Sequence, residues 1–273
     1  MTLNQEQQNR IDRRFARLRG EGRKALVTYI VAGDGGLENT VPLMHQLVAS
    51  GADLIELGVP FSDPMAEGPV IQKGHERALA NRASLRKCLA LVQEFRQRDA
   101  ETPVILMGYA NPIEKMGAEQ FADAAREAGV DGALTVDLPA EEAGPLNQLL
   151  AERDLRNIFL LTPTTSEERI AAITRLASGF VYYVSLKGVT GAGHLDLASV
   201  RDNLARIRRY TDLPLCVGFG IKDGTSARAV SEHGDGAVVG SVLVSAIGEA
   251  PDAAAARERV AALVGEIRSA LDR

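Results

Sequence analysis

Glu56 is the side chain whose position in the sequence most clearly suggests chemistry. It lies in an apolar run between Ile55 and Leu57, where an ionised carboxylate is costly unless it is paired or used. Burial there would raise its pKa, which suits a general acid and base near neutral pH. The alternative is a carboxylate at a strand end that pairs with an Arg or Lys or faces water.

Two more carboxylates, Asp63 and Glu67, follow Glu56 on one short loop. The residues that stiffen this loop are Pro60, Pro64, Gly68 and Pro69. Three acids could bind Mg²⁺ if their oxygens converge together with waters, or each could be solvated separately. Asp63 follows Ser62 and precedes a proline, so it could also fix the turn through an Asx-type hydrogen bond.

Glycines gather in three successive segments of the C-terminal half. These segments are SLKGVTGAGH (185–194), VGFGIKDG (217–224) and VVGS (238–241), in which Ser241 opens a helix. Each segment contains the end of a predicted strand, and small residues at a helix N-terminus leave backbone N–H groups free to bind an anion. A single glycine would only indicate a tight turn, but three such loops in a barrel predict a site for a phosphate-bearing ligand.

Other kinds of catalytic site are not indicated. An imine-forming aldolase needs a Lys that projects from a strand end, whereas Lys187 and Lys222 follow their strands in loops. No G-x-S-x-G motif is present. The four histidines are scattered and none pairs at metal-ligand spacing, so no metal site is expected.

Short apolar runs without polar alternation predict eight buried parallel strands. They are Ala25–Val31, Asp53–Leu57, Pro103–Tyr109, Gly132–Val136, Asn157–Leu161, Phe180–Ser185, Pro214–Gly218 and Gly236–Val239. Amphipathic helical segments lie between them. The clearest are Phe121–Gly129, with a terminal glycine, Ser166–Leu176, which opens on a capping-box pattern, and Val260–Leu271. Ile11, Phe15 and Leu18 form an apolar stripe that predicts an extra helix before the first strand.

Alternating strands and helices without a linker predict an α/β fold, a single (β/α)8 TIM barrel of residues 1–273 with an extra N-terminal helix. A barrel of this kind takes about 250 residues. The alternative is a doubly wound open sheet, which would need a glycine-rich phosphate turn after the first strand. The turn found there, VAGDGG (31–36), is neither G-x-G-x-x-G nor followed by a Walker lysine.

Composition excludes several classes of protein. A formal net charge of −5 and only 4% aromatic residues argue against nucleic-acid binding. The polar N-terminus has no apolar signal region, and the longest apolar runs are too short for a membrane span. Cys88 and Cys216 lie outside any CxxC motif and are interpreted as reduced core thiols of a cytoplasmic protein.

Six segments make the chain resemble the tryptophan synthase alpha chain family over nearly its whole length. They are LIELGVPFSDPMAEGPVIQ (54–72), MGYANP (107–112), GVDGALTVDLPAEE (129–142), FVYYVSLKGVTG (180–191), VGFGI (217–221) and VVGSVLV (238–244). The first is highly specific, while the glycine-rich segments are shared by many phosphate-binding barrels.

The resemblance implies a lyase of tryptophan biosynthesis that cleaves indole-3-glycerol phosphate to indole and glyceraldehyde 3-phosphate by a retro-aldol reaction. Indole then passes through a tunnel to a beta chain that carries pyridoxal phosphate (PLP). The alpha chain itself uses no cofactor. The implied assembly is a tetramer of two alpha and two beta chains (alpha2-beta2).

The resemblance also implies roles for individual residues. Glu56 and Glu67 match the two catalytic carboxylates, although the family residue at the second position is usually Asp. Substrate-binding positions fall on Tyr29, Met107, Tyr109, Tyr182 and Thr190, and phosphate-binding positions fall on Gly191, Gly220, Gly240 and Ser241. The mobile lid corresponds to Leu186–Leu195, where Leu186 replaces an Arg found in some members. The expected beta-chain interface contains Pro60, Phe61, Asp63, Asn111 and Asp137.

Within this reaction we assign the acid–base role to Glu56, which protonates indole C3 and then takes a proton from the hydroxyl, and we assign the indole N–H to Glu67. Two carboxyl groups with separate tasks need environments that separate their pKa values. Two other functions compete with this assignment: a sugar-phosphate isomerase or epimerase with the same phosphate loops, and a non-catalytic chain that only activates a beta chain.

Overall fold

A computed structural model of this protein describes residues 9–185, 196–218 and 220–273. Nine parallel strands in these ranges form a single sheet. The strands are β1 (Ala25–Val31), β2 (Leu54–Gly58), β3 (Val104–Gly108), β4 (Gly132–Thr135), β5 (Arg156–Asn157), β6 (Phe159–Leu161), β7 (Val181–Val184), β8 (Leu215–Gly218) and β9 (Gly236–Val239). Their order is β5-β4-β3-β2-β1-β9-β8-β7-β6. The first strand therefore pairs with the last, as a barrel requires.

The barrel closes through a strand that is interrupted at Ile158. β5 pairs with β4 and β6 pairs with β7, and the Ile158 amide between them donates to the Ala133 carbonyl at 2.9 Å. β5 and β6 thus occupy one strand position, the one predicted over Asn157–Leu161. Eight positions result, which confirms the predicted TIM barrel and excludes the open sheet.

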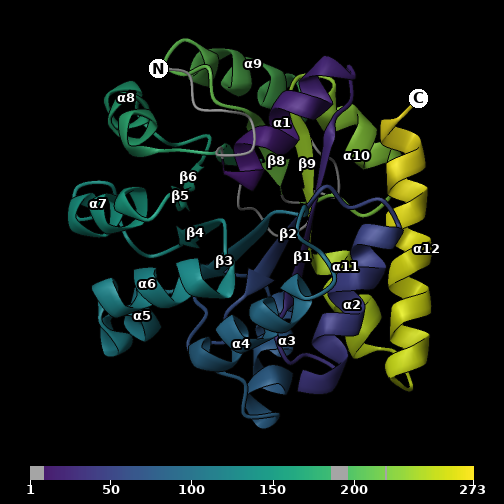
Figure 1. Cartoon of the computed structure of the whole chain (residues 1–273). Helices are drawn as coiled ribbons and strands as arrows, with labels where there is room; N and C mark the ends of the chain where they lie inside the picture. Colours follow the sequence, from purple (N-terminus) through teal and green to yellow (C-terminus); the bar gives the residue numbers. More distant parts are fainter. Residues whose placement is uncertain (1–8, 186–195, 219) are drawn as a thin grey trace.

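Helices cover the outside of the barrel (Figure 1). They are α1 (Arg10–Gly20), α2 (Leu37–Ala49), α3 (Pro69–Ala80), α4 (Leu85–Arg96), α5 (Ala110–Met116), α6 (Ala118–Ala128), α7 (Gly144–Glu152), α8 (Glu167–Leu176), α9 (Leu197–Arg208), α10 (Gly224–Ser231), α11 (Ser241–Gly248) and α12 (Ala253–Leu271). Among the residues described, no helix is both long and apolar enough to cross a bilayer.

The helix ends test the predicted boundaries. α6 ends at Gly129 in the left-handed conformation, with φ +83°, as its glycine predicts. Ser166 caps α8 by accepting from the Arg169 amide, but the third helical position is this arginine, so the predicted capping box is wrong because no acidic side chain can return the bond. α12 begins at Ala253 rather than Val260, because Asp252 caps it.

Two apolar layers form the core, because side chains alternate between the two faces of each strand. Outward side chains pack under the helices. Inward side chains fill the lumen with a cluster that includes Val27, Leu54, Ile105, Leu134, Cys216 and Val238. Cys88 and Cys216 are buried free thiols, as predicted. The next inward layer, two residues further along each strand, contains Tyr29 and Glu56.

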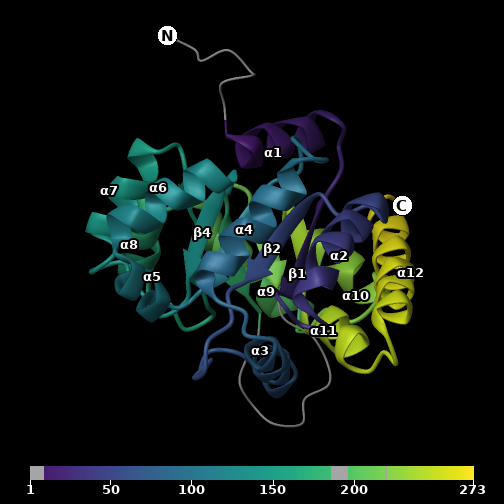
Figure 2. The same cartoon turned by 60° about the horizontal axis from the view of Figure 1, so that its bottom comes forward.

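α1 closes the end of the barrel opposite α3 (Figure 2). Ile11, Phe15 and Leu18 are buried, as their spacing predicts, and join the lumen cluster. The ring centroids of Phe15 and Phe180 lie 5.7 Å apart. The extra helix therefore plugs the N-terminal ends of the strands and leaves the other end for a site.

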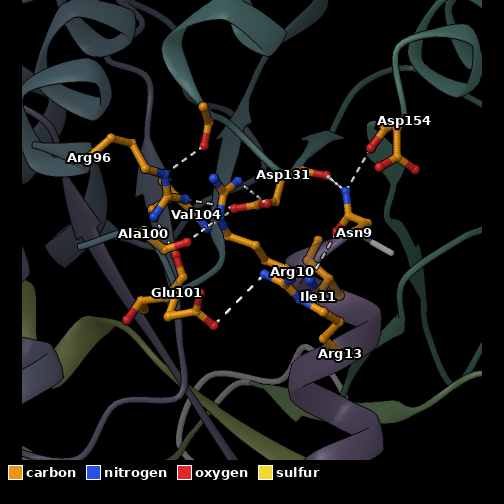
Figure 3. Close-up of polar contacts among 12 residues, drawn as sticks. Asn9, Arg10, Ile11, Arg13, Arg96, Ala100, Glu101, Val104, Asp131 and Asp154 are labelled. Carbon is orange, nitrogen blue, oxygen red and sulfur yellow. Dashed lines mark hydrogen bonds and ion pairs between the residues drawn. The ribbon is translucent and has the colours of Figure 1, made fainter. Parts of the chain in front are cut away.

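A buried polar network attaches α1 to the barrel (Figure 3). Asp131 accepts from Arg10 at 2.9 Å and from Arg96 at 2.7 Å, and it also accepts the Val104 amide at 2.8 Å. Asn9 donates to the Asp131 carbonyl at 2.9 Å and to the Asp154 carbonyl at 2.7 Å. The Asp131 carboxylate is paired with two arginines and a backbone amide, so its burial is tolerated. We interpret this network as structural.

Candidate active site

Glu56 lies in the middle of β2 with its carboxyl group inside the barrel. Its register partners are Tyr29 on β1 and Ile105 on β3, so these side chains lie on the same face of the sheet as Glu56. Its side chain is fully buried, and neither carboxyl oxygen has a hydrogen bond within the described part of the chain. Burial raises the pKa of Glu56 to about 8, so the group is mostly protonated at pH 7.

Glu67 lies on the loop that connects β2 to α3 and is also buried. The Tyr109 hydroxyl donates to Glu67 Oε2 and accepts the Ala66 amide at 3.0 Å. The Gln72 side chain donates to the Glu67 carbonyl at 2.9 Å. Burial raises the pKa of Glu67 to about 7, and the bond from Tyr109 opposes this rise. The structure therefore gives the two glutamates different pKa values, with Glu67 the more easily ionised.

Two tyrosines, the buried Tyr29 and the half-buried Tyr182, lie against glycines in this layer of the barrel. A Cβ atom on Gly58 would collide with the Tyr29 hydroxyl, and one on Gly218 would collide with the Tyr182 hydroxyl. Both positions therefore need glycine for a steric reason that the strand pattern alone did not reveal. Met107 is half-buried and packs against the lumen cluster and against the cluster that contains Tyr29.

The candidate phosphate-binding residues lie after β8 and β9. Gly220 has φ +77°, a conformation that favours glycine. Gly240 precedes Ser241, the first residue of α11, and as a glycine it supplies no side-chain cap to this helix. The positive dipole end of α11 can thus attract an anion. Thr190 and Gly191, with the whole expected lid Leu186–Leu195, lie outside the described residues.

An ion pair connects the α11 region to α3. Arg77 donates to both carboxylate oxygens of Asp34, at 2.7 and 2.9 Å, and to the Val244 carbonyl of α11 at 3.4 Å. The Asp34 side chain is fully buried and follows β1. This contact could not be read from the sequence, and it connects α11 to α3, the helix that follows Glu67.

The five expected interface residues lie around the same loops. Pro60 is buried, and the Phe61 ring stacks on Tyr109 with centroids 4.9 Å apart. Asp63 is exposed and its carboxylate accepts the Ser62 hydroxyl at 2.6 Å. Asn111 and Asp137 are exposed, and Asp137 accepts the Ala110 amide at 2.7 Å in the first turn of α5.

A magnesium site at this loop has no support in the described residues, where no group of three or more His, Cys, Asp or Glu side chains could hold a metal ion. Asp63 and Glu67 instead have different surroundings. Asp63 is exposed, whereas Glu67 is buried. The loop therefore contributes one acid to the interior and leaves one at the surface.

His75 on α3 is a further site residue that the sequence did not indicate. It is 1% exposed, accepts the Phe61 amide through Nδ1 at 3.1 Å, and places Nε2 3.2 Å from the Tyr29 hydroxyl. A signal for its burial was available, because Ile71, His75 and Ala78 have the i, i+4, i+7 spacing of an inward helix face.

The arrangement as a whole can transfer protons on an anionic substrate. A protonated carboxyl group and a more easily ionised one lie at the carboxyl end of the barrel, away from water and beside an uncapped helix N-terminus. Such a site combines general acid–base catalysis with electrostatic stabilisation of a developing charge.

Comparison with known proteins agrees with this geometry. The family described as Tryptophan synthase alpha chain matches residues 15–272. The chain is 59% identical to the tryptophan synthase alpha chain of Thioalkalivibrio sulfidiphilus over 97% of this chain and 100% of that protein. It is 57% identical to that of Nitrosococcus oceani, over 97% and 98%.

Solved structures of the same fold are also similar. Tryptophan synthase subunit alpha from Legionella pneumophila superposes with a TM-score of 0.90 at 46% identity, over 97% of this chain and 98% of that chain. A chain of tryptophan synthase from M. tuberculosis, in its aminoacrylate-bound form, superposes with a TM-score of 0.86 at 32% identity, over 96% and 99%.

Proposed function

This chain belongs to the tryptophan synthase alpha chain family, and we propose that Glu56 and Glu67 divide the proton chemistry of its reaction between them. The enzyme is a lyase that cleaves indole-3-glycerol phosphate to indole and glyceraldehyde 3-phosphate. Glu56 is the acid and base at the reacting carbon, and Glu67 is the anion that faces the indole nitrogen.

The reaction begins with a proton from the Glu56 carboxyl group to indole C3. The ring nitrogen then becomes cationic, and the Glu67 carboxylate stabilises it by accepting a hydrogen bond from its N–H group. The Glu56 carboxylate next removes the proton of the substrate hydroxyl, and the bond from C3 to the glycerol carbon breaks as the aldehyde forms. The bond electrons return to the ring, so indole leaves neutral and Glu56 is again protonated.

The observation that carries this assignment is the isolation of the Glu56 carboxyl group. It is fully buried without a hydrogen bond in the described structure, and its pKa is about 8. A group in that state is protonated before the reaction and is a competent base after it. Glu67 differs because the Tyr109 hydroxyl stabilises its ionised form.

For the substrate phosphate, we propose binding by Gly191, Gly220, Gly240 and Ser241, with Thr190 closing over the glutamates. Support comes from the uncapped N-terminus of α11, where backbone N–H groups favour an anion. Tyr29, Met107, Tyr109 and Tyr182 are proposed to form the wall around the indole ring, since they lie at the same end of the barrel as Glu56.

An alpha chain of this family implies a beta-chain partner. We propose a tetramer of two alpha and two beta chains (alpha2-beta2), with PLP in the beta chain and none here. The proposed interface contains Pro60, Phe61, Asp63, Asn111 and Asp137. Met65 supports this location, because it lies on the same loop with 84% of its surface exposed. We further propose a single domain over residues 1–273 and a cytoplasmic location, which two free thiols support.

Incubation of the purified chain with indole-3-glycerol phosphate is expected to release indole and glyceraldehyde 3-phosphate in equal amounts. Indole is measured by chromatography, with and without an added beta chain. Absence of both products under both conditions would exclude the proposed reaction. Isomerisation of a separately supplied sugar phosphate, without indole release from indole-3-glycerol phosphate, would support the competing isomerase.

Ser241→Asp is expected to raise the KM for indole-3-glycerol phosphate by roughly ten- to a hundredfold, because a carboxylate at the start of α11 repels the phosphate. The melting temperature should not fall, since an acidic residue in the first helical turn is favourable. Ser241→Ala, which removes only the hydroxyl, is the matched control. Equal KM values for the two variants would place the phosphate elsewhere.

A further inference from the structure

His75 connects three separate parts of the site. It lies on the inward face of α3, while Phe61 belongs to the loop after β2 and Tyr29 to β1. Its Nδ1 lies 3.1 Å from the Phe61 amide, and its Nε2 lies 3.2 Å from the Tyr29 hydroxyl. Nε2 is also 4.0 Å from Glu67 Oε1.

These contacts define the protonation state of the ring. A backbone amide can only donate, so the nitrogen that accepts from Phe61 carries no proton. The groups that surround His75 are the Tyr29 hydroxyl and the Glu67 carboxyl, and burial lowers the pKa of the imidazole to about 4. A neutral ring then carries its only proton on Nε2, which donates to the Tyr29 hydroxyl oxygen.

This bond sets the direction of the tyrosine proton. Since the Tyr29 oxygen accepts from His75, its own O–H is free to donate to another group. Tyr29 is the register partner of Glu56, and its ring lies against Gly58 and Gly240. The hydroxyl end of the ring lies against Gly58 and the Cβ end against Gly240. The hydroxyl is therefore in the barrel layer of the acid–base glutamate, where it can donate to a substrate oxygen.

We infer that His75, as the neutral Nε2–H tautomer, is a positioning residue that holds the Glu67 loop through Phe61 and orients the Tyr29 hydroxyl toward the substrate. The inference rests on the proposed function, because it concerns the same site. It differs from the acid–base roles of the glutamates, since His75 keeps the same proton throughout and acts only through its neighbours.

Nitrogen NMR of protein labelled at its four histidines tests the tautomer without any substrate. The His75 signals, identified by their loss in His75→Gln, are expected to show one protonated and one unprotonated ring nitrogen, with the proton on Nε2. The pattern should stay constant from about pH 5.5 to about pH 8.5, across the usual histidine pKa. A doubly protonated ring in that range, or a proton on Nδ1, would overturn the inference.

Three substitutions separate the two contacts of the ring. The His75→Gln amide reaches the Nε2 position and can still donate to Tyr29, while the His75→Asn amide reaches only the Nδ1 position and can still accept from Phe61. His75→Phe keeps the ring shape and loses both bonds. We expect kcat to fall roughly threefold in His75→Gln, tenfold in His75→Asn and a hundredfold in His75→Phe. The KM of each variant should stay within about threefold of wild type.

His233→Gln, at an exposed histidine, is the matched control and should keep the wild-type kcat. Wild-type kcat in both His75→Asn and His75→Phe, or equal losses in all three variants, would overturn the positioning role. If His75→Phe does not fold, the kcat values of His75→Gln and His75→Asn, together with the NMR of the ring nitrogens, still test the positioning role. Failure of the wild-type protein to release indole would instead refute the proposed function and leave the tautomer result standing.

Discussion

Glu56→Gln is expected to reduce the kcat for indole formation by about 10³-fold or more, while the barrel remains folded. Gln has nearly the same shape as a protonated Glu, and the carboxyl oxygens of Glu56 have no hydrogen bond among the described residues that the amide could break. The amide can neither give a proton to indole C3 nor remove one from the hydroxyl, and general acid–base catalysis contributes about 10²–10⁴-fold. Single-turnover measurement of indole release checks the expectation, and turnover near wild type would contradict the assignment.

The same substitution should also stabilise the folded protein increasingly as pH rises from about 5 to about 8. The pKa of Glu56 rises from its usual 4.5 to about 8 on folding. Between these values the unfolded chain has lost the proton that the folded chain keeps, so the free energy of unfolding falls as pH rises through this interval. The loss is at most about 1.4 kcal/mol per pH unit, and Gln removes it.

Urea unfolding gives the free energy of unfolding of wild type and Glu56→Gln, and we compare them at about pH 5 and about pH 8, near the two ends of that interval. The advantage of the variant should be small at the lower pH and several-fold larger at the higher one. The exposed Glu258→Gln is the matched control and should show no such change. An equal difference at both pH values would show that Glu56 is ionised in the folded protein.

The burial of Glu56 could be predicted from the sequence because an apolar run surrounds it, and a carboxylate in a barrel strand suggests a site. That its side chain faces the lumen, on the same side of β2 as Leu54, follows from the structure. The first-to-last strand pairing and the buried stripe of α1 follow from the same local patterns. The interruption at Ile158, the first turn of α8 and the start of α12 differ from the prediction. The interruption depends on hydrogen bonds to the neighbouring strands, whereas the two helix starts depend on the capping residues Ser166 and Asp252.

The partners of Glu67 could not be predicted in the same way. The bond from Tyr109 and the contacts of His75 join residues that are distant in the sequence, on β1, α3 and two loops. No periodicity specifies how a proline-rich loop folds back on a helix. The apolar face of α3 indicated that His75 is buried, but which atoms its ring would meet depends on the packed barrel.

Glu67 is expected to be the second largest contributor to the rate, and its charge should matter more than its length. Glu67→Gln removes the anion that stabilises the cationic indole nitrogen, so kcat/KM should fall by about 10²-fold. Glu67→Asp keeps the charge and withdraws it by about 1.5 Å. The Ala66 amide and the Glu67 carbonyl are both held by side chains, so the loop can follow only in part. The loss for Asp should then be about tenfold, and Glu67→Ala should resemble Gln.

The pH profile separates this charge from the acid at Glu56. The pKa of Glu67 is about 7 and that of Glu56 is about 8, and the reaction needs the first ionised and the second protonated. The value of kcat/KM should therefore rise as pH increases through about 7 and fall through about 8, which gives a narrow bell. Glu67→Asp should keep both limbs, whereas Glu67→Gln should lose only the acidic one, because no carboxyl group remains there to ionise. A wild-type profile in Glu67→Gln would mean that Glu67 has no catalytic role and that the indole nitrogen is stabilised by another group.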